Sequence, residues 1–141
     1  MKIYIGSDHA GYELKELVKK HFEGIFEFVD KGTFSLESVD YPDFAHPVAE
    51  CVLNESDGIG ILICGTGNGM AMSANKHAGI RAALCWSPDI AALAKQHNNA
   101  NILVLPARFI SIDLAMDTIN SFFKAEFEGG RHQRRIDKIN L

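Results

Sequence analysis

Short runs of apolar residues alternate along this chain with longer segments in which apolar residues recur every three or four positions. The short runs predict five strands, at residues 2–7, 26–30, 60–64, 81–85 and 102–105. The 3-and-4 spacing predicts helices at 12–22, about 45–53, from the glycine loop to about 76, 88–97, after Ser111, and at about 131–140. Strands that alternate with helices predict an α/β fold, with a parallel sheet that helices cover on both faces.

Length, composition and charge narrow the class of protein. The 141 residues predict a single domain, 1–141, and a content of 47% hydrophobic and 23% charged residues is ordinary for a soluble globular protein. A net charge of −4 disfavours nucleic acid or a membrane surface as partner. No segment approaches the roughly 20 apolar residues that span a bilayer. The apolar start stops at Asp8, so no signal peptide is expected.

The cysteines favour a reducing compartment. The chain has three of them, widely spaced and without a CxxC pair, so neither a zinc knuckle nor a redox pair is indicated. A cytoplasmic protein is therefore expected.

Polar and small residues follow two of the predicted strands. Asp8 and His9 come after the first strand, and Cys64 is followed by the loop Gly65–Gly69 after the third. In parallel α/β sheets, ligands bind at the carboxyl ends of strands where the strand order reverses. These segments are therefore candidates for a binding site, although Asp8 could equally be a helix cap with His9 exposed.

The glycine loop has the composition of an anion site. Three glycines in five residues leave N–H groups uncovered at the start of a helix, where the helix dipole also attracts negative charge. A plain strand-to-helix turn is the alternative. The spacing G-x-G-x-G departs from the dinucleotide fingerprint, and no Lys-Ser/Thr follows as in a P-loop. Cys64, beside this helix start, is either a thiolate that acts as base or nucleophile, or a buried structural cysteine.

Further candidates lie elsewhere in the chain. Gln96-His97-Asn98 precedes the fifth strand, so it belongs to the opposite end of the sheet and would meet the glycine loop only in a neighbouring subunit. Arg131 and Arg135, four residues apart on one helix face, could grip a phosphate together, or could belong to a solvated basic tail. Arg108, after the fifth strand, is another phosphate candidate.

Six stretches, in order across nearly the whole chain, resemble the type B ribose-5-phosphate isomerase family, which includes the galactose-6-phosphate isomerase subunits. They are Gly6-Ser7-Asp8-His9-Ala10-Gly11, Asp40-Tyr41-Pro42, Ile63-Cys64-Gly65-Thr66-Gly67, Ala74-Asn75-Lys76 with Gly79-Ile80-Arg81-Ala82, Gln96-His97-Asn98, and Gly129-Gly130-Arg131-His132-Gln133. The resemblance implies a Rossmann-like three-layer α/β/α fold with a five-stranded parallel sheet. It also implies a homodimer or a dimer of dimers with shared active sites, and neither a metal nor another cofactor.

The activity implied is that of an aldose–ketose isomerase. It would interconvert ribose 5-phosphate and ribulose 5-phosphate by ring opening and an enediolate, in the non-oxidative pentose phosphate pathway. A six-carbon substrate, allose or galactose 6-phosphate, is one alternative. The other is a non-catalytic binder of phosphate ligands, which would need neither Cys64 nor His97.

The resemblance also assigns roles to residues. Cys64 matches the catalytic base, and residues 70–75 contain no acid that would replace it, as a glutamate does in another branch. Thr66 matches the residue that stabilises the enediolate. His97 matches the ring-opening residue, with Asp8 as helper and Asn98 in contact with the sugar. Backbone groups of the loop residues Gly65, Gly67, Asn68 and Gly69 match the element that binds the substrate. The residues that match phosphate ligands are His9, Arg108, Arg131 and Arg135. Tyr41 matches a residue that lines the pocket. Leu105-Pro106-Ala107 departs from the family's usual glycine-containing turn, which leaves the placement of Arg108 open.

Overall fold

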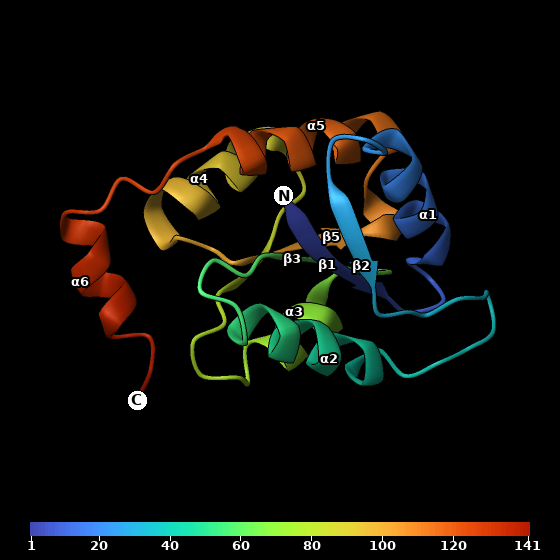
Figure 1. Cartoon of the computed structure of the whole chain (residues 1–141), viewed down its shortest axis with the longest axis horizontal. Coiled ribbons are helices and arrows are strands. Elements are labelled where there is room, and N and C mark those ends of the chain that lie inside the picture. The colour runs from blue at the N-terminus through green and yellow to red at the C-terminus, as the bar shows by residue number, and fades with distance from the viewer.

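Five parallel strands form one sheet in the order β2-β1-β3-β5-β4 (Figure 1). The computed structural model describes residues 1–141. The strands are β1 (Lys2–Ser7), β2 (Glu27–Asp30), β3 (Gly60–Cys64), β4 (Ala82–Leu84) and β5 (Ile102–Pro106). Every neighbouring pair is parallel, as the alternation of strands and helices predicts.

Helices cover both faces of this sheet. The helices α1 (Tyr12–His21), α4 (Pro88–Asn98) and α5 (Ile112–Lys124) pack on one face, and α2 (Pro42–Leu53) and α3 (Asn68–Ala74) pack on the other. The last helix, α6 (Arg131–Asp137), packs against the end of α4 and stands at one end of the molecule (Figure 1). The expected three-layer α/β/α architecture is thus confirmed. No helix combines the length and the apolar character that crossing a membrane requires.

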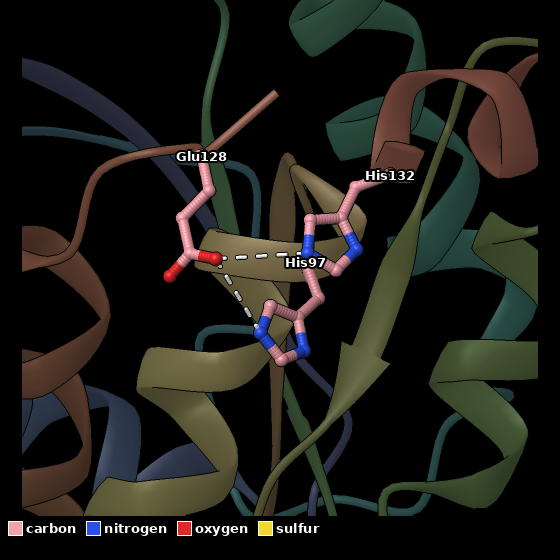
Figure 2. Close-up of side chains that lie close together, drawn as sticks. All are labelled: His97, Glu128 and His132. Carbon is pink, nitrogen blue, oxygen red and sulfur yellow. Dashed lines mark ion pairs between the residues drawn. The ribbon is translucent and has the colours of Figure 1, made fainter. Parts of the chain in front are cut away.

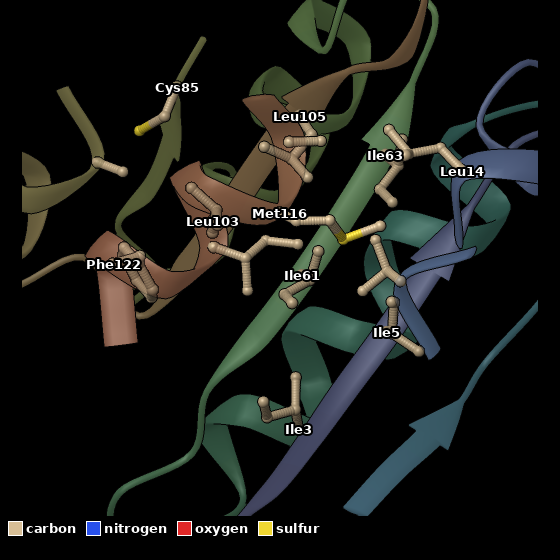
Figure 3. Packing of buried hydrophobic residues seen from close by; sticks show 14 of the residues in the cluster. Ile3, Ile5, Leu14, Ile61, Ile63, Cys85, Leu103, Leu105, Met116 and Phe122 are labelled. Atoms are coloured by element: carbon tan, nitrogen blue, oxygen red, sulfur yellow. The ribbon is translucent and has the colours of Figure 1, made fainter. Parts of the chain in front are cut away.

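Alternate side chains of the central strands point into two separate cores. Ile61 and Ile63 of β3 face α1 and α5 (Figure 3), whereas Leu62 and Cys64 face α2 and α3. Since both faces of a parallel sheet are buried, every position of β3 is enclosed, and the strand is apolar from end to end. The same alternation directs the thiol of Cys64 toward the α2–α3 layer.

Every predicted helix and strand is present, but most differ from the prediction by one to three residues at one or both ends. Pro106 was expected to lie just after the fifth strand, but it is the last residue of β5 and pairs with Cys64. Proline has no backbone N–H to donate, and at the end of a strand this interrupts no further pairing. The final helix ends at Asp137 instead of about 140. Helix α2 begins at Pro42, earlier than its apolar spacing indicates, because proline suits the first helical turn.

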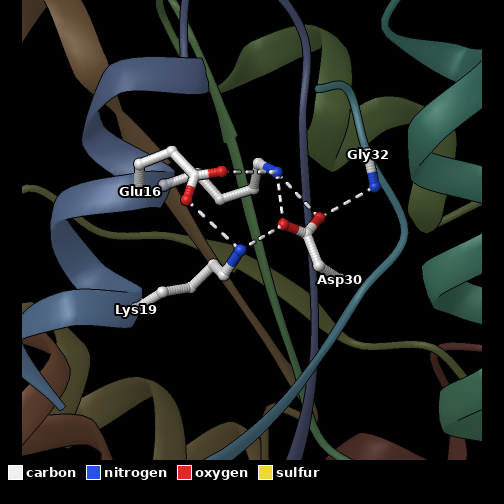
Figure 4. Close-up of polar contacts among 5 residues, drawn as sticks. Glu16, Lys19, Asp30 and Gly32 are labelled. Atoms are coloured by element: carbon white, nitrogen blue, oxygen red, sulfur yellow. Dashed lines mark hydrogen bonds and ion pairs between the residues drawn. The ribbon is translucent and has the colours of Figure 1, made fainter. Parts of the chain in front are cut away.

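A buried ion pair holds the segment that follows β2. The Lys15 side chain is 0% exposed, and its Nζ lies 2.7 and 2.6 Å from the two carboxylate oxygens of Asp30. Lys19 Nζ lies 2.8 Å from the same carboxylate, and the Gly32 N–H donates to it at 2.9 Å (Figure 4). Burial by itself would raise the pKa of Asp30, but the hydrogen bonds from Lys15, Lys19 and Gly32 hold it below its ordinary value.

Candidate active site

The strand order reverses between β1 and β3. The chain leaves β1 toward β2 on one side, and it later enters β3 on the other side of β1. The crevice outside the carboxyl ends of these two strands is where α/β sheets bind ligands. The N–H of Asp8, just past β1, donates to the Ile63 carbonyl at 3.2 Å, so Asp8 and Cys64 leave the sheet side by side.

Cys64 is the last residue of β3, at this end of the sheet, and 4% of its surface is exposed. The glycine loop follows directly, and Gly67 adopts a positive φ of 79° as the N-cap of α3. The N–H groups of Gly65, Thr66 and Gly67 donate to no acceptor within the chain. The Cys64 thiol is therefore followed directly by three N–H groups that are free to donate. The sequence predicts the same neighbours, a cysteine next to an anion-binding loop.

One N–H group of the loop is already engaged. The N–H of Asn68 donates to Thr66 Oγ1 at 3.2 Å, closing a short turn. This bond orients the Thr66 hydroxyl. The Thr66 side chain itself is exposed.

Tyr41 and Arg108 lie over the loop from two other elements. A Cβ atom added to Gly69 would come within 2.5 Å of Tyr41 Cε1, and one added to Gly65 would come within 3.2 Å of Arg108 Nη1. The backbone N–H of Arg108 also donates to the Gly65 carbonyl at 3.0 Å. The glycines thus permit close approach of these side chains, and the departure at 105–107 still leaves Arg108 against the loop.

His9 is fixed in one orientation by the segment before α2. Its Nδ1 accepts the N–H of Val39 at 3.1 Å. In the neutral ring the proton must therefore sit on Nε2, which leaves Nε2 as a donor for an anion. The Asp8 carboxylate accepts the N–H of Gly11 at 3.0 Å, which closes a turn before α1. The N-cap of α1 is Gly11 and no side chain caps it, so the alternative that Asp8 is the helix cap is wrong.

A second group of candidate residues gathers where α4 meets α6. His97 and Asn98 lie in the last turn of α4, and the ring of His97 stacks on His132 of α6 with centroids 4.3 Å apart. Burial lowers the pKa of His132, and the nearby His97 and Arg131 lower it further. A pocket of about 330 Å³ is lined by His97, Asn98, His132, Arg135, Ile136 and Ile139.

Within one chain the two groups are far apart. Cys64 pairs with Pro106 at one end of the sheet, and Gly60 pairs with Ile102 at the other. Four residue steps along a strand span about 13 Å, and His97 lies beyond the Ile102 end. The structure therefore joins Asp8, His9, Tyr41, Arg108 and the glycine loop to Cys64, and keeps His97, Asn98, Arg131 and Arg135 away from it.

A family model described as Ribose/Galactose Isomerase matches residues 3–139. The chain belongs to this family. A probable ribose-5-phosphate isomerase B of Mycoplasma genitalium is 51% identical over 97% of this chain and 92% of the relative. The ribose-5-phosphate isomerase B of Escherichia coli is 46% identical over 98% of this chain and 93% of the relative.

Solved structures of the ribose/galactose isomerase family have the same fold. A ribose 5-phosphate isomerase of Thermotoga maritima aligns with a TM-score of 0.95 at 57% identity, covering 99% of this chain and 97% of the other. The Mycoplasma genitalium ribose-5-phosphate isomerase B with bound ribulose-5-phosphate aligns with a TM-score of 0.93 at 50% identity, covering 98% and 93%. The resemblance seen in the sequence is confirmed, as is the Rossmann-like fold that it implied.

Two supporting residues in this family member were not singled out from the sequence. Arg81 Nε donates to the carbonyls of Asn98 and Asn99 at 3.2 and 2.9 Å, which holds the end of α4 that carries His97. Glu128 lies beside the stacked rings of His97 and His132, with its carboxylate near both (Figure 2). Arg81 lies inside one of the matching stretches, so it could have been found. No local signal marks Glu128.

Proposed function

We propose that this chain interconverts D-ribose 5-phosphate and D-ribulose 5-phosphate, as a ribose-5-phosphate isomerase of the non-oxidative pentose phosphate pathway. The observation that carries the proposal is the near-complete alignment, at 50% identity, with a ribose-5-phosphate isomerase B that holds bound ribulose-5-phosphate. The thiol and the free N–H donors at the switch point supply the chemistry that this reaction needs. Because the reaction moves hydrogen within one molecule, it needs neither an external oxidant nor a cofactor.

Cys64 is the base in this scheme. As a thiolate it removes the proton from C2 of the open-chain aldose and returns it to C1. Negative charge then develops on the sugar oxygens of the enediolate, within reach of the loop donors of Gly65, Thr66 and Gly67. A preorganised donor of this kind contributes about 3–4 kcal/mol to a transition state. The Thr66 hydroxyl, oriented by its bond to Asn68, adds a further polar group.

The phosphate serves as the handle that positions C1 and C2 over the thiol. His9 Nε2–H and the Arg108 guanidinium face this end of the site from the same chain as Cys64. Tyr41, packed on Gly69, lines the pocket. Arg131 and Arg135 complete the phosphate set from a second subunit, because their own chain holds them at the opposite end.

Ring opening requires the other group of residues. His97 exchanges protons with the ring oxygen and the anomeric hydroxyl, Asp8 assists, and Asn98 binds the sugar. Since His97 and Cys64 lie at opposite ends of one chain, a homodimer with composite sites supplies both, and a dimer of dimers would preserve them. The three unpaired cysteines suit a reducing compartment, and we assign the protein to the cytoplasm.

The experiment is solvent exchange at C2 together with turnover. Ribose 5-phosphate deuterated at C2 should lose its label to water with the wild-type protein, and Cys64→Ala should abolish both this exchange and turnover. Cys51→Ala, which changes a half-buried cysteine of α2 outside the site, is the matched control and should keep the wild-type rate. Wild-type exchange by Cys64→Ala would remove Cys64 from the role of base. Turnover of allose 6-phosphate but not of ribose 5-phosphate would overturn the choice of substrate.

A further inference from the structure

Three side chains with metal-binding atoms converge where α4, α6 and the segment before α6 meet. Nε2 of His97 lies 3.7 Å from Oε1 of Glu128, and Nε2 of His132 lies 3.6 Å from the same oxygen (Figure 2). One ligand atom from each of the three residues lies within 4.8 Å of the other two. The proposed reaction uses His97 alone of the three, so it does not account for the cluster.

Two backbone hydrogen bonds hold the segments that carry these three side chains close together. The N–H of Glu128 donates to the carbonyl of Gln96 at 3.0 Å, which fixes Glu128 beside the residue that follows Gln96, His97. The N–H of His132 donates to the Gly129 carbonyl at 3.2 Å, which starts α6 just after Glu128. Gly129 and Gly130 both have positive φ, and they allow the sharp turn that brings His132 over His97.

Neither distance to Glu128 is that of a hydrogen bond, since N–H···O bonds have a heavy-atom separation of about 2.7–3.2 Å. Both distances are close to those around a bound cation. For a zinc ion held at about 2.0–2.2 Å by each ligand, adjacent corners of the tetrahedron lie about 3.3–3.6 Å apart. A cation placed among the three atoms would require the side chains to shift and the two imidazole rings to tilt.

We propose that Nε2 of His97, Nε2 of His132 and Oε1 of Glu128 form a binding site for a divalent cation of the zinc class. Two imidazoles and one carboxylate suit zinc and its neighbours cobalt, nickel and copper, whereas magnesium and calcium prefer sets of oxygen ligands. Three protein ligands leave a fourth position for water or a ligand oxygen.

The side chains have the freedom that binding requires. The imidazole planes now lie 13° from parallel, so they must tilt for both nitrogen lone pairs to point at one ion. The side chains of His97 and Glu128 are 40% and 52% exposed and have room to turn, while His132 is buried and anchors the site.

Metal at this site would inhibit the isomerase, and this consequence rests on the proposed function. The cation would take the lone pair of Nε2 in the His97 ring, and it would hold the imidazole that the proposed function uses for proton transfer during ring opening. Ribose 5-phosphate is mainly cyclic, whereas ribulose 5-phosphate, with its C5 oxygen esterified, is open-chain. Zinc should therefore slow conversion of ribose 5-phosphate more strongly than conversion of ribulose 5-phosphate, and a chelator should reverse the effect.

Binding is tested apart from activity, by competition for Zn²⁺ against a chromophoric chelator and by the visible spectrum with Co²⁺. The wild-type protein should bind one ion per chain, and Glu128→Gln should weaken binding about tenfold or more. Glu126→Gln, an equal change at an exposed glutamate two residues earlier, is the matched control and should bind as the wild type does. Because the Glu128 side chain is half exposed, its replacement by Gln leaves the folded structure intact.

Cys64→Ala separates this site from binding by the thiol. Retained zinc affinity in Cys64→Ala, with a Co²⁺ spectrum that lacks thiolate charge-transfer absorption, supports the site. Equal affinities of Glu128→Gln and wild type, loss of binding in Cys64→Ala, or a thiolate band with Co²⁺ would each overturn it. A protein that binds zinc in this way but turns over no ribose 5-phosphate would refute the proposed function and leave the metal site standing.

Discussion

The buried ion pair between Lys15 and Asp30 can be tested by Asp30→Asn, which removes the charge and keeps the shape. The Lys15 ammonium would then remain enclosed, with its side chain 0% exposed and Glu16 Oε1, 3.7 Å away, as its remaining carboxylate. Lys19, which is partly exposed, can turn to water. A buried charge that loses its partner costs about 3–5 kcal/mol, and the distant Glu16 favours the lower end of that range.

The measurement is urea unfolding at equal protein concentrations, because oligomerisation would make stability concentration-dependent. A loss of about 3 kcal/mol corresponds to a fall in melting temperature of about 6–12 °C for a chain of this size. Adding Lys15→Met to Asp30→Asn should recover much of the loss, because it removes the stranded charge and keeps an apolar stem.

The pH dependence follows from the lowered pKa of Asp30. A carboxyl group whose pKa is lower in the folded state contributes stability that is present above its unfolded pKa, about 3.9, and is lost as the pH falls through the folded value. The difference between wild type and Asp30→Asn should therefore be full at neutral pH and should shrink below about pH 4. A loss under 1 kcal/mol at pH 7, or a difference that persists at low pH, would refute the reasoning.

Two other results are expected. Cys64→Ala and His97→Ala chains can be unfolded together and refolded as a mixture. Half of the dimers should then contain one chain of each kind and one intact composite site, which restores about a quarter of the wild-type activity. A mixture that recovers no activity would contradict shared sites. Ser7→Ala should leave the free energy of unfolding unchanged or raise it by about 1 kcal/mol, because the Ser7 hydroxyl is buried without a hydrogen-bond partner. A destabilisation above 1 kcal/mol in urea unfolding would contradict that expectation.

The amino-acid sequence by itself determined the α/β class and the limits of the central strands. Strands β1 and β3 have the predicted limits, because strands covered by helices on both faces are mostly apolar and stand out from the polar segments around them. Ser111 caps α5, the helix predicted to follow it, and its hydroxyl accepts the Leu114 N–H at 3.2 Å. Ser87 occupies the N-cap of α4, but its hydroxyl makes no such bond. Local rules predict the strand limits and the helix after Ser111 because these features depend on neighbours along the chain.

Only the tertiary structure decided which of the polar residues meet. The strand order puts Asp8 beside Cys64 and sends His97 to the opposite end of the sheet. It also encloses Lys15 completely, and it brings Glu128 beside two stacked histidines that are 35 positions apart in the sequence. Periodicity describes one element at a time, whereas these contacts join elements far apart in the chain. They exist because of how the sheet and its helices pack, which no local pattern of apolar and polar residues contains.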